Sequence, residues 1–394
     1  MSSENLITSS LITKDADVST NKEKDDINPS TNENHAICFF FLHIKKLYYE
    51  ISFITKLSST SQNRCICSGF GKAMDLWKML FHPTIFLSIV VYCVHGQAPP
   101  CPPSENVYPC FCDSDGLLTS VSCTGFRGLD KLLPVLKNTQ NHNVSFGFWK
   151  SNLDVIPSDF FSGHKSVNLH FENCKISSFG SRPFSGLEDS LKSIYIYGSV
   201  DKRIKDLTAF PLGHLNKLVD LAFQANDIKK LGNDWFEGGP KSLEQLNLEA
   251  NDIEELGDRA FESLENVKQI WLGDNNFKQV SRSMFPNPAK KLWLLEMSFN
   301  GISELPEDMF YNMPVLSRVN VAGNKLKTIS EDVFRQIWPQ LEEVYFERNN
   351  EFVCDYKIKW IYEQKLPSII TGKCGGSNSL RGKNLEDLDE EAFE

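Results

Sequence analysis

One sequence motif recurs through residues 143–348 and restricts the fold more than any other feature. Apolar residues follow the template L-x-x-L-x-L-x-x-N-x-L in five clear consecutive copies, and a sixth copy begins after them. The asparagines of these copies are separated by 25, 24, 25, 24 and 25 residues. Such regular self-similarity predicts a solenoid of stacked coils instead of one closed globular core. The asparagines are Asn226, Asn251, Asn275, Asn300, Asn324 and Asn349.

Three looser copies precede the clear ones. Ser151 takes the Asn position in the first and Cys174 in the second, and the third opens at Ile194 and carries extra residues before Leu218. We therefore expect about nine repeats in all. For Cys174 we expect a buried free thiol; the alternative is a reactive cysteine, which would need a partly exposed, electropositive setting.

The template gives each residue type a position in the coil. Apolar residues point inward from a short strand and from the turn after it, so that stacked coils bury one continuous core. The Asn also faces inward, although it is polar. Its amide can pair with backbone groups of its own turn and of the neighbouring coil, which avoids the ~1–3 kcal/mol penalty of an unpaired buried polar group. We therefore expect one column of hydrogen-bonded Asn side chains.

A second periodic feature supports the same register. A Phe stands ten residues after most of the Asn positions, which accounts for part of the total of 28 Phe residues. Aromatic residues at fixed spacing can line a cofactor site, but one Phe per coil is typical of core packing. We expect an internal spine on the convex side and no cofactor. The spine residues are Phe161, Phe184, Phe236, Phe261, Phe285, Phe310 and Phe334.

The segment before the repeats is expected to lie outside the fold. Residues 1–73 show no period and are interpreted as disordered or as a gene-model extension. From Met74 a charged start, an apolar run beginning at Ile85 and small residues up to Ala98 follow the layout of a signal peptide over 74–98. The alternative is an uncleaved membrane anchor near Ile85, but its apolar run of about ten residues is shorter than the ~20 that cross a bilayer. We predict a secreted, extracellular protein, with a single-pass membrane anchor as the alternative.

Cysteines bracket the repeats, with four in the segment 99–142 and two in the segment 349–394. A solenoid exposes its apolar core at both ends, so we expect these segments to form caps, with an acidic tail included in the second segment. Four cysteines allow three pairings, and their spacing does not select one. Zinc is the alternative, but export favours disulfides and no His lies near the C-x-C pair, so we expect no metal. The cysteines are Cys101, Cys110, Cys112, Cys123, Cys354 and Cys374.

With these caps the chain resembles the extracellular leucine-rich-repeat family with cysteine-rich caps, which includes Slit, Toll-type and small proteoglycan ectodomains. The resemblance implies an α/β solenoid: a leucine-rich-repeat horseshoe with a parallel concave β-sheet and disulfide-bonded terminal caps. In the N-terminal caps of that family the first Cys pairs with the third and the second with the fourth. This implies the disulfides Cys101–Cys112 and Cys110–Cys123 here.

The C-terminal cap departs from the family pattern. Tyr356 stands where the second Cys of a C-x-C pair would be, so the resemblance implies one bridge only, between Cys354 and Cys374.

A narrower resemblance covers about residues 98–394. The N-terminal cap, the aromatic-rich first strands and the tail sequence LRGKNLEDL are similar to the arthropod proteins named after the non-catalytic subunit of Oplophorus luciferin 2-monooxygenase. That resemblance implies a leucine-rich-repeat protein that accompanies a catalyst without being one. It does not imply light emission.

The outward-facing positions of the strands are the candidate binding surface. Nine strands at ~4.8 Å spacing span about 40 Å, which is enough for a protein or glycan ligand. Trp and Tyr dominate interface hot spots, although aromatic residues on neighbouring strands can instead pack against one another. We predict a binding strip on the concave face formed by Tyr195, Tyr197, Trp271, Trp293 and Tyr345.

Charge and motifs argue against other classes of function. A net charge of −10 without clustered Lys and Arg argues against nucleic-acid binding. The repeat region contains no nucleophile elbow, zinc-protease motif, phosphate loop or dinucleotide fingerprint, so we expect no catalytic residues and no enzyme activity. The sequon at Asn143 predicts N-glycosylation during export.

These observations predict a secreted protein that binds a protein or glycan through its concave face. The alternative is a non-catalytic stabilising subunit of a luciferase-like monooxygenase complex, partnered by a small catalytic subunit. The protein that co-purifies with the native chain would distinguish the two.

Overall fold

The computed structural model describes residues 101–115, 118–140, 142–200, 210–349 and 352–394. The chain divides into two units, Met1–Met79 and Leu80–Glu394, and all described residues belong to the second. The expected extension at 1–73, the signal peptide at 74–98 and the alternative anchor near Ile85 lie outside the described residues.

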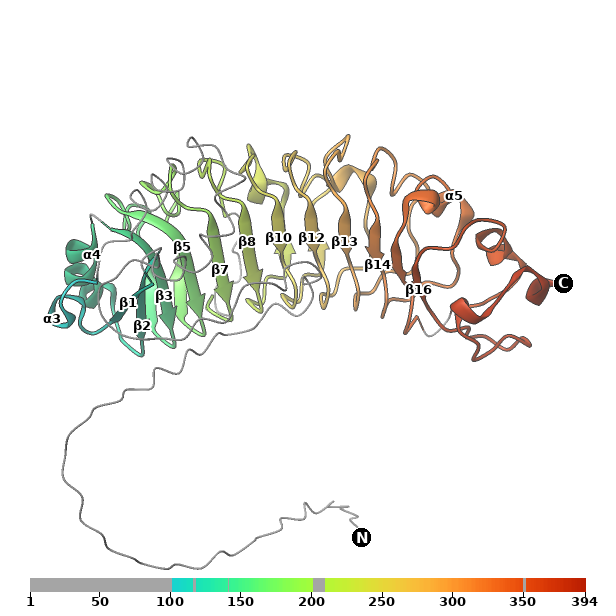
Figure 1. Cartoon of the computed structure of the whole chain (residues 1–394), viewed down its shortest axis with the longest axis horizontal. Coiled ribbons are helices and arrows are strands. Elements are labelled where there is room, and N and C mark those ends of the chain that lie inside the picture. Colours follow the sequence, from blue (N-terminus) through green and yellow to red (C-terminus); the bar gives the residue numbers. More distant parts are fainter. Residues whose placement is uncertain (1–100, 116–117, 141, 201–209, 350–351) are drawn as a thin grey trace, which may run out of the picture. The chain divides into compact units, whose positions relative to one another are not determined.

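A single 12-stranded sheet runs along this second unit, and its strands lie side by side in Figure 1. The β1–β2 pair is antiparallel, and every later neighbour is parallel, as stacked coils require. In order along the sheet, the strands are β1 (Phe111–Ser114), β2 (Thr119–Thr124), β3 (Asn143–Trp149), β5 (Lys165–Glu172), β7 (Ser193–Tyr197), β8 (Asp220–Gln224), β10 (Gln245–Asn247), β12 (Gln269–Trp271), β13 (Leu294–Glu296), β14 (Arg318–Asn320), β15 (Glu343–Tyr345) and β16 (Ile369–Thr371).

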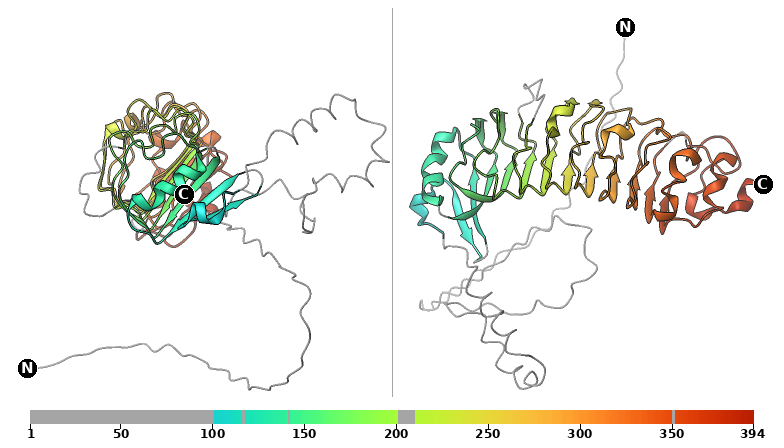
Figure 2. Two further views of the ribbon diagram at one scale, coloured as in Figure 1. Left: turned by 90° about the vertical axis from the view of Figure 1, so that its left-hand side faces the viewer. Right: turned by 90° about the horizontal axis from the view of Figure 1, so that it is seen from above.

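Short elements form the rest of each coil, and the coils overlap as a ring when viewed along the stack (Figure 2, left). Two small parallel pairs join β4 (Asn152–Val155) to β6 (Lys175–Ser178) and β9 (Lys230–Leu231) to β11 (Glu255–Leu256). The helices are α3 (Ser104–Val107), η1 (Leu129–Leu132), α4 (Leu133–Thr139), η2 (Asn233–Phe236), η3 (Arg282–Met284), α5 (Glu331–Phe334), η4 (Trp338–Gln340), η5 (Tyr356–Ile361), η6 (Leu385–Asp387) and η7 (Glu390–Phe393).

The solenoid predicted from the repeats is confirmed, because template positions align from strand to strand. Between 143 and 348 the described residues contribute nine parallel strands to the sheet, β3 to β15, one for each expected repeat. In these strands one inward-facing column is fully buried, so the apolar face of each coil is covered by its neighbours. The column is Phe146, Leu169, Ile194, Leu221, Leu246, Ile270, Leu295, Val319 and Val344.

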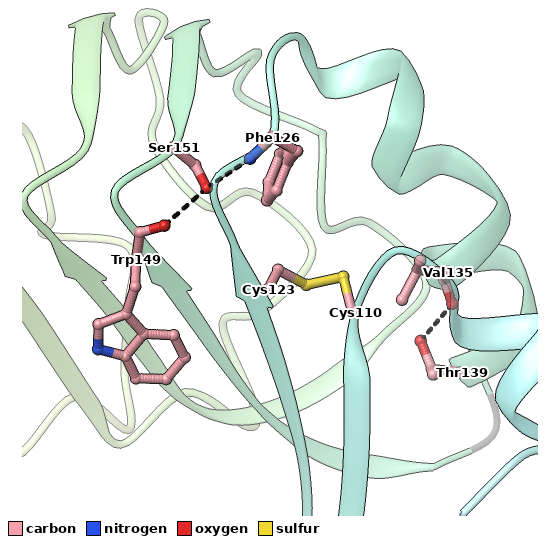
Figure 3. Close-up of a disulfide and its surroundings, with 7 residues drawn as sticks. All are labelled: Cys110, Cys123, Phe126, Val135, Thr139, Trp149 and Ser151. Carbon is pink, nitrogen blue, oxygen red and sulfur yellow. Dashed lines mark hydrogen bonds between the residues drawn. A yellow bond between two sulfur atoms is a disulfide. The ribbon is translucent and has the colours of Figure 1, made fainter.

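The asparagines form the predicted hydrogen-bonded column. Asn226 Oδ1 accepts from the backbone nitrogen of Ser199 in the preceding coil at 2.9 Å, and its Nδ2 donates to the carbonyl of Ile196 at 2.9 Å. The backbone nitrogen of Asn226 in turn donates to Asn251 Oδ1 at 2.9 Å. Each amide therefore joins its own turn to an adjacent coil. Ser151 makes the same kind of contact with a shorter side chain (Figure 3).

The residue directly before each Asn position of the repeat, or before the Ser or Cys that replaces the Asn, adopts the left-handed backbone region. The repeat template does not reveal this conformation. These residues include Phe299 and Arg348, with φ of 52° and 60°, so the coil imposes this conformation even on bulky side chains. The full set is Lys150, Asn173, Gly198, Ala225, Ala250, Asp274, Phe299, Gly323 and Arg348.

The Phe spine is buried throughout and has one more member than the spacing predicts. Phe210 follows Ser199 by eleven residues and contacts Phe184, with ring centroids 6.2 Å apart. Cys174 is a buried free thiol that donates to the Phe148 carbonyl at 3.3 Å. Burial raises the pKa of this thiol, which disfavours the thiolate, as expected for a structural cysteine.

Disulfides close both ends of the stack. The N-terminal bridges are Cys101–Cys112 and Cys110–Cys123, the pairs that the family resemblance implies, and the second one joins the residue before β1 to β2 (Figure 3). Cys354–Cys374 lies after the last repeat.

The acidic C-terminal tail packs onto the last coil. Its Leu385 is fully buried, and the Leu385 carbonyl accepts a hydrogen bond from Tyr362 Oη at 3.0 Å. The tail therefore covers apolar surface at the end of the stack.

Candidate functional site

The concave face is defined here as the outward-facing side chains of the 12-stranded sheet. Strand register brings one central column of these side chains into line, at intervals of one coil. From β5 to β15 the column is His170, Tyr195, Ala222, Asn247, Trp271, Glu296, Asn320 and Tyr345.

Four aromatic side chains at the N-terminal part of this face form the aromatic stack: Trp149, His170, Tyr195 and Tyr197. The Trp149 and His170 rings are stacked at 5.2 Å, and the His170 and Tyr195 rings at 4.4 Å. Tyr197 lies parallel to Tyr195 at 6.3 Å. The stack therefore crosses β3, β5 and β7 and holds its rings against one another.

Gly147 makes room for the first ring of the stack. A Cβ placed on Gly147 would lie 1.9 Å from an indole carbon of Trp149, so the ring lies directly over the backbone of its own strand. Figure 3 shows Trp149 on the face of the strand that points away from Phe126 and the disulfide. A larger residue at 147 would displace the indole from His170.

A carboxylate lies beside the stack. Glu172 Oε2 is 3.1 Å from His170 Nε2, which fixes the imidazole orientation. Burial, followed by the charge of Glu172, raises the pKa of the Tyr195 phenol. Tyr195 therefore carries a neutral hydroxyl across the physiological pH range.

In the middle of the concave face, from β8 to β14, the central column has one aromatic residue, Trp271, and polar side chains flank it. Asn247 Nδ2 donates to Glu249 Oε2 at 2.8 Å, and Gln224 Nε2 donates to the same oxygen at 3.2 Å. Burial raises the pKa values of Asp220 and Glu249. The Glu249 carboxylate is thus already engaged by two neighbouring amides.

Glu296 is the most deeply buried carboxylate of the face, with an exposed fraction of 6%. Its Oε1 accepts from the backbone nitrogen of Ser298 at 2.9 Å, and its carboxylate lies against Gly273. Burial raises the pKa of Glu296 to about 7, and the charges of Glu249 and Asp274 act in the same direction.

Ion pairs dominate the C-terminal part of the face. The Arg318 guanidinium lies over the Trp293 indole, 5.6 Å from its centroid, and pairs with Glu343. Tyr345 Oη donates to Glu343 Oε2 at 2.6 Å. Burial and this hydrogen bond raise the pKa of Tyr345 to about 12. Trp293 and Tyr345 are therefore held by charged residues of the chain itself.

The five residues predicted as a binding strip do not form one contiguous group. Tyr195 and Tyr197 lie together on β7, whereas Trp271 lies on β12, Trp293 just before β13 and Tyr345 on β15. Register separates Tyr195 from Trp271 by Ala222 and Asn247. Their suitability as binding residues stays a prediction.

Sequence reasoning missed two features of this face. The first is Ala222, whose small side chain interrupts the central column. The second is the cation–π contact between Arg318 and Trp293. Aligning the template copies by their strand positions would have revealed the first, because the column can be extracted from the repeat spacing.

Other candidate sites can be placed briefly. Asn143 is exposed at the start of β3. Among the described residues no group of three or more His, Cys, Asp or Glu side chains could hold a metal ion. In the same residues no helix is long and apolar enough to cross a membrane.

Comparison with known proteins supports the repeat assignment. The family model described as the BspA type leucine rich repeat region matches six copies, over residues 137–251 and 229–360.

Two solved structures share the architecture. A chain of the octameric complex of Latrophilin 3, Unc5D and FLRT2 (LRR) is 19% identical with a TM-score of 0.52, over 73% of this chain and 98% of that one. A chain of the TLR13–ssRNA13 complex is 20% identical with a TM-score of 0.50, over 64% of this chain and 38% of that one. At such identities the likeness shows the fold alone.

Proposed function

Because the chain belongs to the BspA-type leucine-rich-repeat family, we propose that it is an extracellular binding protein whose concave face receives a protein or glycan partner. The supporting observation is that the concave face gathers aromatic and polar side chains from many coils onto one surface. Tyr197 is 39% exposed there, and Tyr195 and Trp271 are half-buried. Aromatic residues held in this way lose little conformational entropy when a partner packs on them.

Extracellular location is supported by chemistry. Three disulfides are formed within the described residues, and such bonds persist in oxidising compartments. The solved complex that contains FLRT2 joins leucine-rich-repeat, lectin-type and immunoglobulin modules by its description, which fits a binding role for this fold. We expect the full chain to enter the medium of secreting cells and to begin, by N-terminal sequencing, after Gly96 or Ala98. Recovery only in the membrane fraction would favour the anchored alternative.

Site-specific photo-crosslinking tests the concave face. A benzoylphenylalanine placed at Tyr195 should yield a discrete adduct in native extract. The same probe at Tyr311 is the matched control, because Tyr311 is an aromatic residue that is 51% exposed and lies outside the sheet. Adducts that form equally at both positions, or at neither, would contradict the proposal. A catalytic enzyme in the Tyr195 adduct would identify the chain as a non-catalytic subunit.

A further inference from the structure

We propose that the partner presents a basic protein segment to the central concave face, defined as the outward-facing residues of β7 to β13, and that one Lys or Arg side chain lies over Ala222 against the ring of Tyr195. This inference rests on the proposed function, because it names the class of partner that the same face would bind.

The first step is the space beside Tyr195. His170 covers one face of the Tyr195 ring at 4.4 Å, and Tyr197 lies parallel to that ring at 6.3 Å on the same strand. On the neighbouring strand β8, the side chain in register with Tyr195 is the methyl group of Ala222. The next larger side chain, Asn247, is two strands away, or about 10 Å at the usual strand spacing. At that spacing the stem of an extended basic side chain would pack on Ala222 and its charged end on the ring.

The second step is the charge around that position. Asp220 and Glu249 flank Ala222, on its own strand and on the neighbouring coil. Asp220 is half-buried, and among the described residues burial is the one influence on its carboxylate, with no hydrogen bond or ion pair beside it. A carboxylate in that setting gains from a cationic partner more than an exposed one does.

The third step is charge complementarity over a wider area. The outward-facing positions of β7, β8, β10, β12 and β13 contain Asp220 and Glu296 and no Lys, Arg or His. Outside these strands, basic side chains stand at Lys165 and His170 on β5 and at Arg318 on β14. Lys268, which directly precedes β12, is paired with Glu244 at 2.8 Å. A partner that is basic along an extended segment therefore matches the whole central face.

The fourth step separates a cationic ligand from a neutral one. The amide donors that a glycan would use at this position, Gln224 Nε2 and Asn247 Nδ2, already donate to Glu249. Each of these amides keeps one further N–H, so hydrogen bonding alone does not select the ligand. A cationic ligand also gains from the carboxylates Asp220 and Glu249 and from the Tyr195 ring, whereas a neutral sugar gains no charge complementarity there.

Isothermal titration of the full chain tests this inference with defined probes. The probes are an octapeptide of alternating Gly and Arg, the same peptide with Gln in place of Arg, and the neutral sugar chitotetraose. We expect the Arg peptide to bind, more weakly at high salt, and the two neutral probes to bind at least about tenfold more weakly.

Three variants locate the binding position. Asp220→Asn removes the unpaired charge, Tyr195→Leu removes the aromatic face, and Ala222→Leu fills the space while keeping every charge. Each should lower affinity for the Arg peptide about three- to tenfold. Glu304→Gln is the matched control, since Glu304 is an exposed carboxylate outside the 12-stranded sheet, and it should leave affinity unchanged.

The outcomes separate this inference from the proposed function. If the Arg peptide does not bind, or if Glu304→Gln weakens it as much as Asp220→Asn, the basic-partner inference is wrong. The crosslink at Tyr195 would still support concave-face binding in that case. Tight binding of chitotetraose that Tyr195→Leu abolishes would replace the basic segment by a glycan at the same face.

Discussion

Two regions of the concave face use the same residue types differently. In the N-terminal region Trp149, His170 and Tyr195 stack on one another, and their contacts are between rings. In the C-terminal region Trp293 and Tyr345 are each held by a charged side chain, Arg318 above the indole and Glu343 at the phenol. An aromatic residue on a sheet is therefore available to a partner only where its own neighbours leave a face or an edge free.

The carboxylate between the two regions gives the largest expected effect. Because folded Glu296 holds its proton more tightly than the unfolded chain does, its contribution favours folding below about pH 4.5 and is lost as the pH rises through about 7. Glu296→Gln removes this loss and should stabilise the protein by up to about 3 kcal/mol at pH ~8, with little effect at pH ~4.5. Urea unfolding at both pH values measures the difference.

The exposed Glu304 provides the control for this prediction. Glu304→Gln should change the free energy of unfolding by less than about 0.5 kcal/mol at either pH. Equal stabilisation by Glu296→Gln at both pH values would show that the pKa of Glu296 is not raised in the folded protein.

The next largest effect is expected from a substitution that disrupts the aromatic stack in the N-terminal region alone. Gly147→Ala places a methyl group within the indole of Trp149 and should displace that ring from His170. We expect a loss of about 1–3 kcal/mol of stability and of near-ultraviolet circular dichroism from the stack. In a Trp149→Ala background the same substitution should cost much less, because the colliding ring is absent. An equal cost in both backgrounds would contradict the proposed collision.

A smaller effect is expected from a substitution that removes the ionic contacts of the C-terminal region. Arg318→Met keeps much of the side-chain length but removes the charge over Trp293 and beside Glu343. Since Arg318 is about one-third exposed, we expect a loss of no more than about 1 kcal/mol. Indole fluorescence should shift as Trp293 loses its cation. Unchanged fluorescence and stability would show that ion pairing does not distinguish this region from the aromatic stack.

The smallest effect is spectroscopic and concerns the phenol of Tyr345. Its pKa of about 12 means that Tyr345 stays mostly protonated near pH ~11, so Tyr345→Phe should barely change the tyrosinate absorbance there. Glu343→Gln weakens the acceptor of the phenol proton and should make Tyr345 ionise at lower pH. Full ionisation of Tyr345 in the unaltered protein at that pH would show that its phenol does not donate a stable hydrogen bond to Glu343.

The sequence predicted what each coil does by itself. The inward-facing residues, the Asn column and most of the Phe spine follow from a period of 24 or 25 residues, because they are set within one repeat and copied to the next. Phe210 was not predicted because its coil is longer than the repeat period. The left-handed residues were not predicted because the coil imposes their conformation, and not a preference of the residue type.

Only the tertiary structure decided which outward side chains meet. Tyr195 and Ala222 are 27 residues apart in the chain, and Trp293 and Arg318 are 25 residues apart. The register of the strands makes the members of each pair neighbours. The repeat does not restrict outward-facing residues, since solvent accepts almost any side chain at those positions. Their contacts depend on the rings and charges of the adjacent coil, and these are brought together only when the coils stack.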